Sequence, residues 1–142
     1  MANTLGIIKP DAVRRKLVGQ IITRIEQAGL VLRGMKAVKL TRDQAQRFYA
    51  VHESKPFYKP LVEFMTSGPI VVMVLGGHGS IEGWRDLMGA TDPAKAKYNT
   101  IRRDFGTSIE KNAVHGSDSE ETARAEVSFF FTTDEILPKE SS

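Results

Sequence analysis

The chain has 142 residues, of which 41% are hydrophobic, and this length and apolar content suit one domain over residues 1–142 with a single core. The absence of cysteine excludes disulfide frameworks, thiolate metal sites and a cysteine nucleophile. The net charge is only +3 and no five or six like charges follow one another, which argues against extended nucleic acid as the main partner.

Apolar spacing predicts the elements in the first part of the chain. The short apolar run over residues 4–9, closed by Pro10, predicts a strand. Apolar residues at helical spacing predict a helix over 13–28, and Gly29 suits the left-handed position that ends it. The alternation of apolar and basic residues then predicts a half-buried strand over 30–40.

The middle of the chain predicts helices on either side of a buried strand. A capping-box pattern at Thr41 begins a helix that continues to His52, and another helix is expected over 61–65. The continuous apolar run 70–75 predicts a central strand that is covered on both faces or lines a deep core. A glycine-rich turn leads from this strand into a short helix over 81–88.

The last third of the chain is less regular. Residues 89–114 show no strong periodicity, and compact domains seldom contain so long an irregular segment unless it is functional. A short helix over 120–125, a last strand over 127–131 and a brief helix over 134–138 follow. Four strands with helices between them predict an α+β ferredoxin-like sandwich, a four-stranded antiparallel sheet with helices on one face.

The charges are unevenly distributed along the chain. Residues 1–71 hold twelve basic and five acidic side chains, whereas residues 72–142 hold eight and twelve. A chance asymmetry of a solvated surface and a small polyanion as ligand both account for this distribution. Charged residues near the start argue against a signal peptide, and no apolar run is long enough to span a bilayer, so we expect a soluble, cytoplasmic protein without a membrane partner.

Three histidines are candidates for chemistry. His52 falls on a helical stripe and His78 in a glycine-rich turn, so packing or a surface position accounts for both. That turn, Gly76–Ser80, is not a P-loop, because the chain has no Gly-Lys-Ser or Gly-Lys-Thr triplet. His115 lies among glycine and small polar residues that leave room for an incoming group, although an isolated histidine of this kind is more often structural.

The residues around His115 change that balance. Asn112–Asp118 reads Asn-x-x-His-Gly-Ser-Asp and resembles the active-site signature of bacterial nucleoside diphosphate kinases. The likeness covers nearly the whole chain, including Ile7–Asp11, Pro56–Phe57, Gly89–Pro93, Thr100–Arg102, Glu126 and Phe129–Phe130. It implies a single nucleoside diphosphate kinase domain with a ferredoxin-like core, a magnesium–nucleotide substrate and transfer of the terminal phosphate through a phosphohistidine.

The resemblance assigns the phosphoryl-transfer residues by position. His115 corresponds to the nucleophile that attacks the γ-phosphate through Nδ1, a role that requires a neutral ring held by a neighbour. Glu126 corresponds to the carboxylate that hydrogen-bonds near this ring, and Ser117 to the residue that holds the glutamate. Without the motif, Glu126 would be interpreted as a surface charge on a strand edge.

Further matched positions imply contacts with the nucleotide. Those that correspond to contacts with the transferred phosphate are Lys9, Tyr49 and Asn112. Those that correspond to contacts with the α- and β-phosphates are Arg85, Thr91 and Arg102. Cations and amide donors suit the negative charge that spreads over a transferring phosphoryl group, although seen alone both arginines would be ordinary surface residues. Phe57 corresponds to the aromatic residue on which the base stacks, with a core position as the alternative.

One loop departs from the family pattern. Tyr98 and Asn99 precede Thr100 where many members have Pro-Gly or Ala-Gly, and a second arginine, Arg103, follows Arg102. Because asparagine is the non-glycine residue that best tolerates a left-handed backbone, we expect the turn to be retained.

The resemblance also implies partners and a cofactor. Nucleoside di- and triphosphates are the expected partners, Mg²⁺ is expected to bind through the substrate phosphates without protein ligands, and the chain is expected to form a homo-oligomer, a tetramer or a hexamer. Two other classes of function are open, a binding module without turnover and a scaffold protein of ferredoxin-like fold. The combination of His115 with Lys9 and two arginines argues against the first, and a polar cluster around an irregular loop argues against the second.

Overall fold

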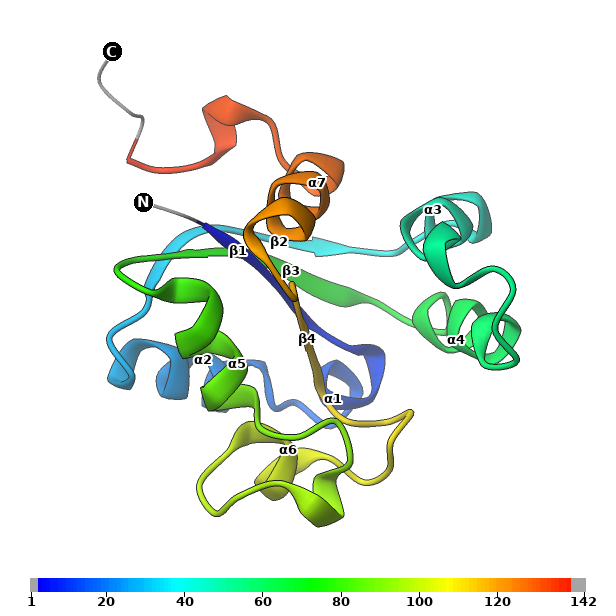
Figure 1. The fold of residues 1–142 in the computed structure, drawn as a ribbon, viewed down its shortest axis with the longest axis horizontal. Coiled ribbons are helices and arrows are strands. Elements are labelled where there is room, and N and C mark those ends of the chain that lie inside the picture. Colours follow the sequence, from blue (N-terminus) through cyan, green and yellow to red (C-terminus); the bar gives the residue numbers. More distant parts are fainter. Residues whose placement is uncertain (1–2, 139–142) are drawn as a thin grey trace.

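The computed structural model describes residues 3–138, which form a four-stranded antiparallel sheet packed among helices (Figure 1). The strands are β1 (Thr4–Ile8), β2 (Val31–Val38), β3 (Ile70–Gly76) and β4 (Val114–Gly116). Their order across the sheet is β2-β3-β1-β4, so β1 pairs with β3 on one side and with β4 on the other. This arrangement is the ferredoxin-like α+β sandwich that the sequence predicts.

The α-helices of the described residues are α1 (Pro10–Arg14), α2 (Val18–Gln27), α3 (Arg42–Phe48), α4 (Tyr58–Met65), α5 (Ser80–Met88), α6 (Ile101–Phe105) and α7 (Glu120–Phe130). Short 3₁₀ turns lie at Ala50–His52, Pro93–Lys95 and Thr133–Glu135. The capping box expected at Thr41 is present and begins α3. Within residues 3–138 no helix is long and apolar enough to cross a membrane.

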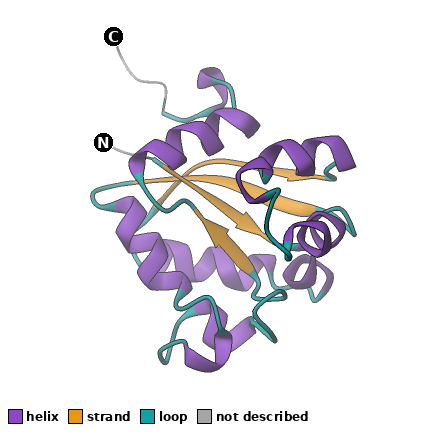
Figure 2. Cartoon of the chain, turned by 45° about the vertical axis from the view of Figure 1, so that its right-hand side comes forward, coloured by secondary structure: helices purple, strands orange, loops and turns teal. Residues whose placement is uncertain are grey.

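Helices cover both faces of the sheet, whereas the sequence led us to expect them on one face (Figure 2). One core contains residues of α1, α2, α5 and α6, and the other contains residues of α3, α4 and α7. The strand β3 supplies both cores, because Val72 and Val74 belong to one and Met73 and Leu75 to the other. Its continuous apolar run correctly predicted a strand covered on both faces, and all seven of its residues are buried.

The helix expected over 13–28 is two helices with a break. Lys16 adopts a left-handed φ of 61°, and the amide of Leu17 donates to the carbonyl of Ala12, which ends α1 and lets α2 begin in a new direction. The spacing of apolar residues does not reveal such a break, because both helices bury residues in the same core. Gly29 has a φ of 85°, as expected for the residue after α2.

The C-terminal part differs most from the sequence prediction. Residues 127–131 form no strand, since α7 continues from Glu120 to Phe130. A capping box at Ser119 begins this helix, and its buried residues Ala123 and Val127 lie four apart, which is a helical period. The fourth strand is instead β4, which begins at the last residue of the segment 89–114 that was expected to be irregular, and the brief helix expected over 134–138 is the 3₁₀ turn Thr133–Glu135.

Candidate active site

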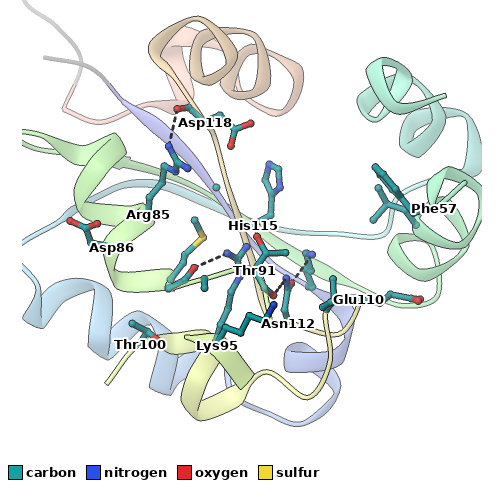
Figure 3. A pocket seen from close by; sticks show the side chains of 18 of the residues that line it. Phe57, Arg85, Asp86, Thr91, Lys95, Thr100, Glu110, Asn112, His115 and Asp118 are labelled. Atoms are coloured by element: carbon teal, nitrogen blue, oxygen red, sulfur yellow. Dashed lines mark hydrogen bonds between the residues drawn. The ribbon is translucent and has the colours of Figure 1, made fainter. Parts of the chain in front are cut away.

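A cleft of about 1000 Å³ opens at the β4 side of the sheet, bounded by α4, α5 and the segment before β4 (Figure 3). Eight of the ten residues that the resemblance assigns to the site line it, namely Lys9, Tyr49, Phe57, Arg85, Thr91, Arg102, Asn112 and His115. The other two lie outside the lining, where Glu126 on α7 contacts His115 and Ser117 contacts Glu126. The fold therefore brings together residues that are spread over more than one hundred positions of the sequence.

His115 belongs to β4, where it pairs with Ile7 of β1. Its Nε2 lies 3.1 Å from Oε1 of Glu126, and the hydroxyl of Ser117 donates to the same carboxylate oxygen at 2.7 Å. When Nε2 carries the ring proton and donates it to Glu126, Nδ1 is the nitrogen with a free lone pair. The imidazole is thereby oriented for chemistry at Nδ1.

Glu126 is suited to hold this tautomer. Burial raises the pKa of its carboxyl group, but the hydrogen bond and charge interaction with His115, the hydrogen bond from Ser117 and the charge interaction with His52 together outweigh that effect, so the net pKa lies below the ordinary value of 4.5. The carboxylate is therefore ionised at neutral pH and accepts both hydrogen bonds.

Lys9 and Asn112 form the floor of the cleft near His115. The ammonium Nζ of Lys9 donates to Oδ1 of Asn112 at 2.8 Å, and Nδ2 of Asn112 donates to the carbonyl of Thr91 at 3.0 Å. Burial, followed by the nearby charge of Arg102, lowers the pKa of Lys9 to about 8. Both side chains are thus held in place, and Lys9 is a desolvated cation that an anion would stabilise.

The two arginines are held by backbone carbonyls. Arg102 donates from Nη1 to Gly89 and from Nη2 to Val114, each at 2.9 Å, while its Nε is buried with no hydrogen-bond partner in the described part of the chain. Burial and the charge of Arg85 lower the pKa of Arg102 to about 10. Arg85 on α5 reaches the carbonyl of Asp118 at 3.4 Å. Together with Lys9, these guanidinium groups make this end of the cleft a site for an anion.

A strained turn precedes the strand that carries His115. Ala113 is fully buried and adopts a φ of 76°, which is unfavourable for a residue with a Cβ. Its carbonyl accepts from the amide of Lys9 at 2.8 Å, and its amide donates to Oδ2 of Asp11 at 3.2 Å. Sequence reasoning overlooked Asp11 as part of the site, and its place directly after Lys9 and Pro10 was the available signal.

The opposite end of the cleft is apolar and open. Phe57, which is labelled in Figure 3, is 49% exposed, and this exposure excludes the core position. The centroid of its ring lies 5.3 Å from the centroid of the His52 ring. Ile109, which is 61% exposed, also lines the cleft. The histidine expected at a packing or surface position, His52, is half-buried and lines the cleft. A flat aromatic surface of this kind accepts any planar ring.

Tyr49 lies between the two ends. Its ring centroid is 6.5 Å from that of His115, and its hydroxyl is buried with no hydrogen-bond partner among residues 3–138. Burial, together with the charge of Glu126, raises the pKa of this phenol well above its ordinary value of 10.0. The hydroxyl is therefore a proton donor at neutral pH that lacks an acceptor.

The loop that departs from the family pattern keeps its turn. Asn99 has a φ of 68°, as expected from its tolerance of the left-handed region. Thr100 then caps α6 by accepting from the amide of Arg103, whose guanidinium donates to the carbonyl of Ala94 at 3.2 Å. These contacts leave Arg102 in the cleft, while Tyr98 is 84% exposed.

Acidic side chains do not gather into a metal cage. Across the described residues there is no group of three or more histidine, aspartate or glutamate side chains placed to hold a metal ion. The acidic residues that line the cleft are Glu82, Asp86, Glu110 and Asp118.

Comparison with known proteins gives consistent results. A family model described as nucleoside diphosphate kinase matches residues 2–136. Nucleoside diphosphate kinase 1 of Protochlamydia amoebophila is 59% identical over 133 residues, covering 94% of each chain. A nucleoside diphosphate kinase of Campylobacter jejuni is 57% identical over 136 residues, covering 96% of this chain and 99% of the relative.

Solved structures show the same likeness. The nucleoside diphosphate kinase of Aquifex aeolicus superposes with a TM-score of 0.93 at 42% identity, covering 96% of this chain and 99% of that one. A halophilic nucleoside diphosphate kinase from Halobacterium salinarum in complex with CDP has a TM-score of 0.93 at 41% identity, covering 99% of this chain and 93% of that one.

Proposed function

Because this chain belongs to the nucleoside diphosphate kinase family, we propose that it transfers the γ-phosphate of a nucleoside triphosphate to a nucleoside diphosphate through a phosphohistidine at His115. The observation that carries the proposal is the arrangement of this ring. Its Nε2 is engaged by Glu126 at 3.1 Å, and it lines a cleft that also contains Lys9, Arg85 and Arg102.

The reaction consists of two half-reactions at one nitrogen. In the first, Nδ1 of His115 attacks the γ-phosphorus, the N–P bond forms as the bond to the bridging oxygen breaks, and the nucleoside diphosphate leaves with that oxygen. In the second, a terminal oxygen of the acceptor diphosphate attacks the same phosphorus and the N–P bond breaks. The proton on Nε2 stays between His115 and Glu126 throughout, so the carboxylate offsets the positive charge of the phosphorylated ring.

The cationic groups of the cleft stabilise the charge on the phosphates. We assign Lys9, Asn112 and Tyr49 to the transferred phosphate, because the ammonium and amide are held together at 2.8 Å and the tyrosine hydroxyl lacks a partner among the described residues. The residues assigned to the α- and β-phosphates are Arg85, Thr91 and Arg102. Donors that are already oriented need no reorganisation in the transition state, which is the main source of electrostatic catalysis.

Magnesium is proposed to enter with the nucleotide. The cleft offers dispersed carboxylates and cationic donors, which suits an ion that is held mainly by phosphate oxygens and water. When bound, Mg²⁺ neutralises part of the phosphate charge. The base is proposed to stack on the exposed ring of Phe57. Stacking uses the flat face that every base has, so we expect the site to accept different bases. Assembly into a tetramer or hexamer is a further prediction from the family resemblance, and a cytoplasmic location is a prediction from the charged residues near the start of the sequence.

Labelling without an acceptor tests the proposal. Brief incubation with γ-³²P-labelled ATP and magnesium should label the protein, and the label should survive base and be lost in acid, as expected for a phosphoramidate. His115→Ala should take up no label, whereas His78→Ala, at an exposed histidine that does not line the cleft, should label normally. Steady-state rates should give parallel double-reciprocal lines. A label that is stable in acid, or that persists in His115→Ala, would contradict the assignment.

A further inference from the structure

The largest fully buried side chain of the described residues, Trp84, contacts the backbone of the proposed nucleophile. Its indole Nε1 donates to the carbonyl oxygen of His115 at 3.2 Å. Trp84 is 0% exposed, and it directly precedes Arg85 on α5. One helix therefore holds the backbone of His115 with one residue and lines the cleft with the next.

Two glycines make room for the indole. Gly6 of β1 and Gly116 of β4 are directly paired across the sheet. A Cβ on Gly116 would lie 2.6 Å from Nε1 of Trp84, and a Cβ on Gly6 would lie 3.3 Å from another atom of the ring. The indole ring thus occupies space that a larger residue at position 116 would fill. The close approach of α5 to β4 therefore depends on Trp84 and on Gly116 together.

The hydrogen bond has a mechanical consequence for the site. Strand β4 has three residues and pairs only with β1, so one of its sides has no neighbouring strand. Side chains supply partners for its carbonyls, since Trp84 binds that of His115 and Arg102 binds that of Val114. The position of this short strand relative to α5 is then set by the indole, and with it the position of His115 relative to Arg85.

We propose that Trp84 is a positioning residue for phosphoryl transfer, which fixes His115 opposite the phosphate-binding groups through its indole N–H. The proposal rests on the function proposed for His115. In this proposal the hydrogen bond itself, and not only the bulk of the ring, positions His115. Its loss should lower the rate of transfer much more than nucleotide binding, because a small displacement of a reacting atom affects the transition state more than the ground state.

Trp84→Phe separates the hydrogen bond from the packing, since it keeps an aromatic ring and removes the N–H. We expect the rate constant of the first half-reaction at saturating ATP to fall about tenfold, with nucleotide affinity changed less than about twofold. Gly116→Ala, whose Cβ would collide with the indole and with the end of the Met88 side chain, should also lower this rate constant. Phe64→Leu, at a buried residue of the other core, is the matched control and should leave the rate constant unchanged. An unchanged rate constant in a folded Trp84→Phe protein, whatever its melting temperature, would reduce Trp84 to a packing residue.

The wild-type protein provides a second test that does not depend on turnover. Trp84 is the single tryptophan of the chain, so its indole N–H gives one resonance in a ¹⁵N-labelled sample. We expect this proton to exchange slowly with solvent deuterium, and its signal to remain in His115→Ala, which keeps the carbonyl. A rapidly exchanging indole proton would overturn the proposal. If the indole proton exchanges slowly but His115 is not phosphorylated, the proposed function is contradicted, and Trp84 then has no role in phosphoryl transfer.

Discussion

The two ends of the cleft are built in different ways. At the phosphate end, Lys9, Asn112 and Arg102 are held by hydrogen bonds of 2.8 to 3.0 Å to one another or to backbone carbonyls. At the proposed base end, Phe57 is 49% exposed. All nucleotides carry the same phosphate groups, whereas their bases differ. Under the proposed function, the rigid end of the cleft therefore binds the phosphates and the open end binds the base.

The rigid end carries an energetic cost that the open end does not. Within residues 3–138, the hydroxyl of Tyr49 and the Nε of Arg102 are buried without hydrogen-bond partners. Burial also lowers the pKa of Lys9 and of Arg102. Each of these features is relieved by an anion, so the phosphate end is organised for a ligand at the expense of the stability of the free protein. Mutations at the two ends should therefore affect different quantities.

The largest effect is expected at His115. His115→Ala removes the only nucleophile in the proposed mechanism, and turnover should fall at least about a thousandfold. The phosphate-binding groups are untouched, so nucleotide affinity measured by calorimetry should change little. A variant that retains rapid transfer would move the reacting group elsewhere in the cleft.

A smaller effect on the same end is expected from Glu126. Glu126→Ala removes the group that holds the tautomer of His115, and kcat should fall by about one to two decades while nucleotide affinity stays nearly constant. Glu126→Gln retains an acceptor oxygen and should lose less. Weaker nucleotide binding with normal turnover would show that Glu126 belongs to the binding surface and not to the orientation of the ring.

The base end should respond in affinity. A stacked base contributes about 1–3 kcal/mol, so Phe57→Ala should weaken binding by about one to two decades, with similar losses for adenine, guanine, cytosine and thymine nucleotides. Its melting temperature should fall little because the ring is 49% exposed.

Phe64→Ala, in the helix that follows Phe57, is the matched control. Phe64 is buried, so its truncation should cost about 3–5 kcal/mol of stability and leave the base surface in place. A large fall in melting temperature with unchanged affinity in Phe57→Ala would place the base elsewhere.

The smallest effect is a pH dependence at the phosphate end. With a pKa of about 8, Lys9 loses its proton as the pH rises through 8, and kcat/KM should fall about tenfold for each unit above that value. Lys9→Arg keeps its charge, so its profile should be flat between pH 8 and pH 9.

The same titration has an effect of opposite sign on stability. The unfolded chain keeps the Lys9 proton up to about the ordinary value of 10.5, so the free energy of unfolding should rise between pH 8 and pH 10.5. Denaturant unfolding at several pH values measures this free energy, with Lys9→Arg as the reference.

The two titrations share one group in this interpretation. If the pH profiles of kcat/KM are identical in the wild-type and Lys9→Arg proteins, the fall in kcat/KM belongs to a group other than Lys9.

Much of the site was predictable from the sequence because it depends on local residue identity. The motif around His115 is recognisable in the chain, the family resemblance that it carries assigns Lys9, Arg85 and Arg102, and all four residues line the cleft. Other parts were not predictable. The hydrogen bonds from the amide of Ala113 to Asp11 and from the indole of Trp84 to the carbonyl of His115 join residues 102 and 31 positions apart, and no local pattern encodes such pairs.

The sequence by itself determined the family, the central strand β3 and the capping box that begins α3, because these follow from motifs, from short apolar runs and from side chains that bond their own backbone. Only the tertiary structure decided that residues 127–130 are helical and that Val114–Gly116 is a strand. The three phenylalanines after Ser128 favour a strand by propensity, but helical spacing buries Ala123 and Val127 against the sheet. Residues Val114–Gly116 form strand β4 because they pair with the free edge of β1. A free edge is present only in the folded sheet, so the local sequence of this segment does not encode the strand.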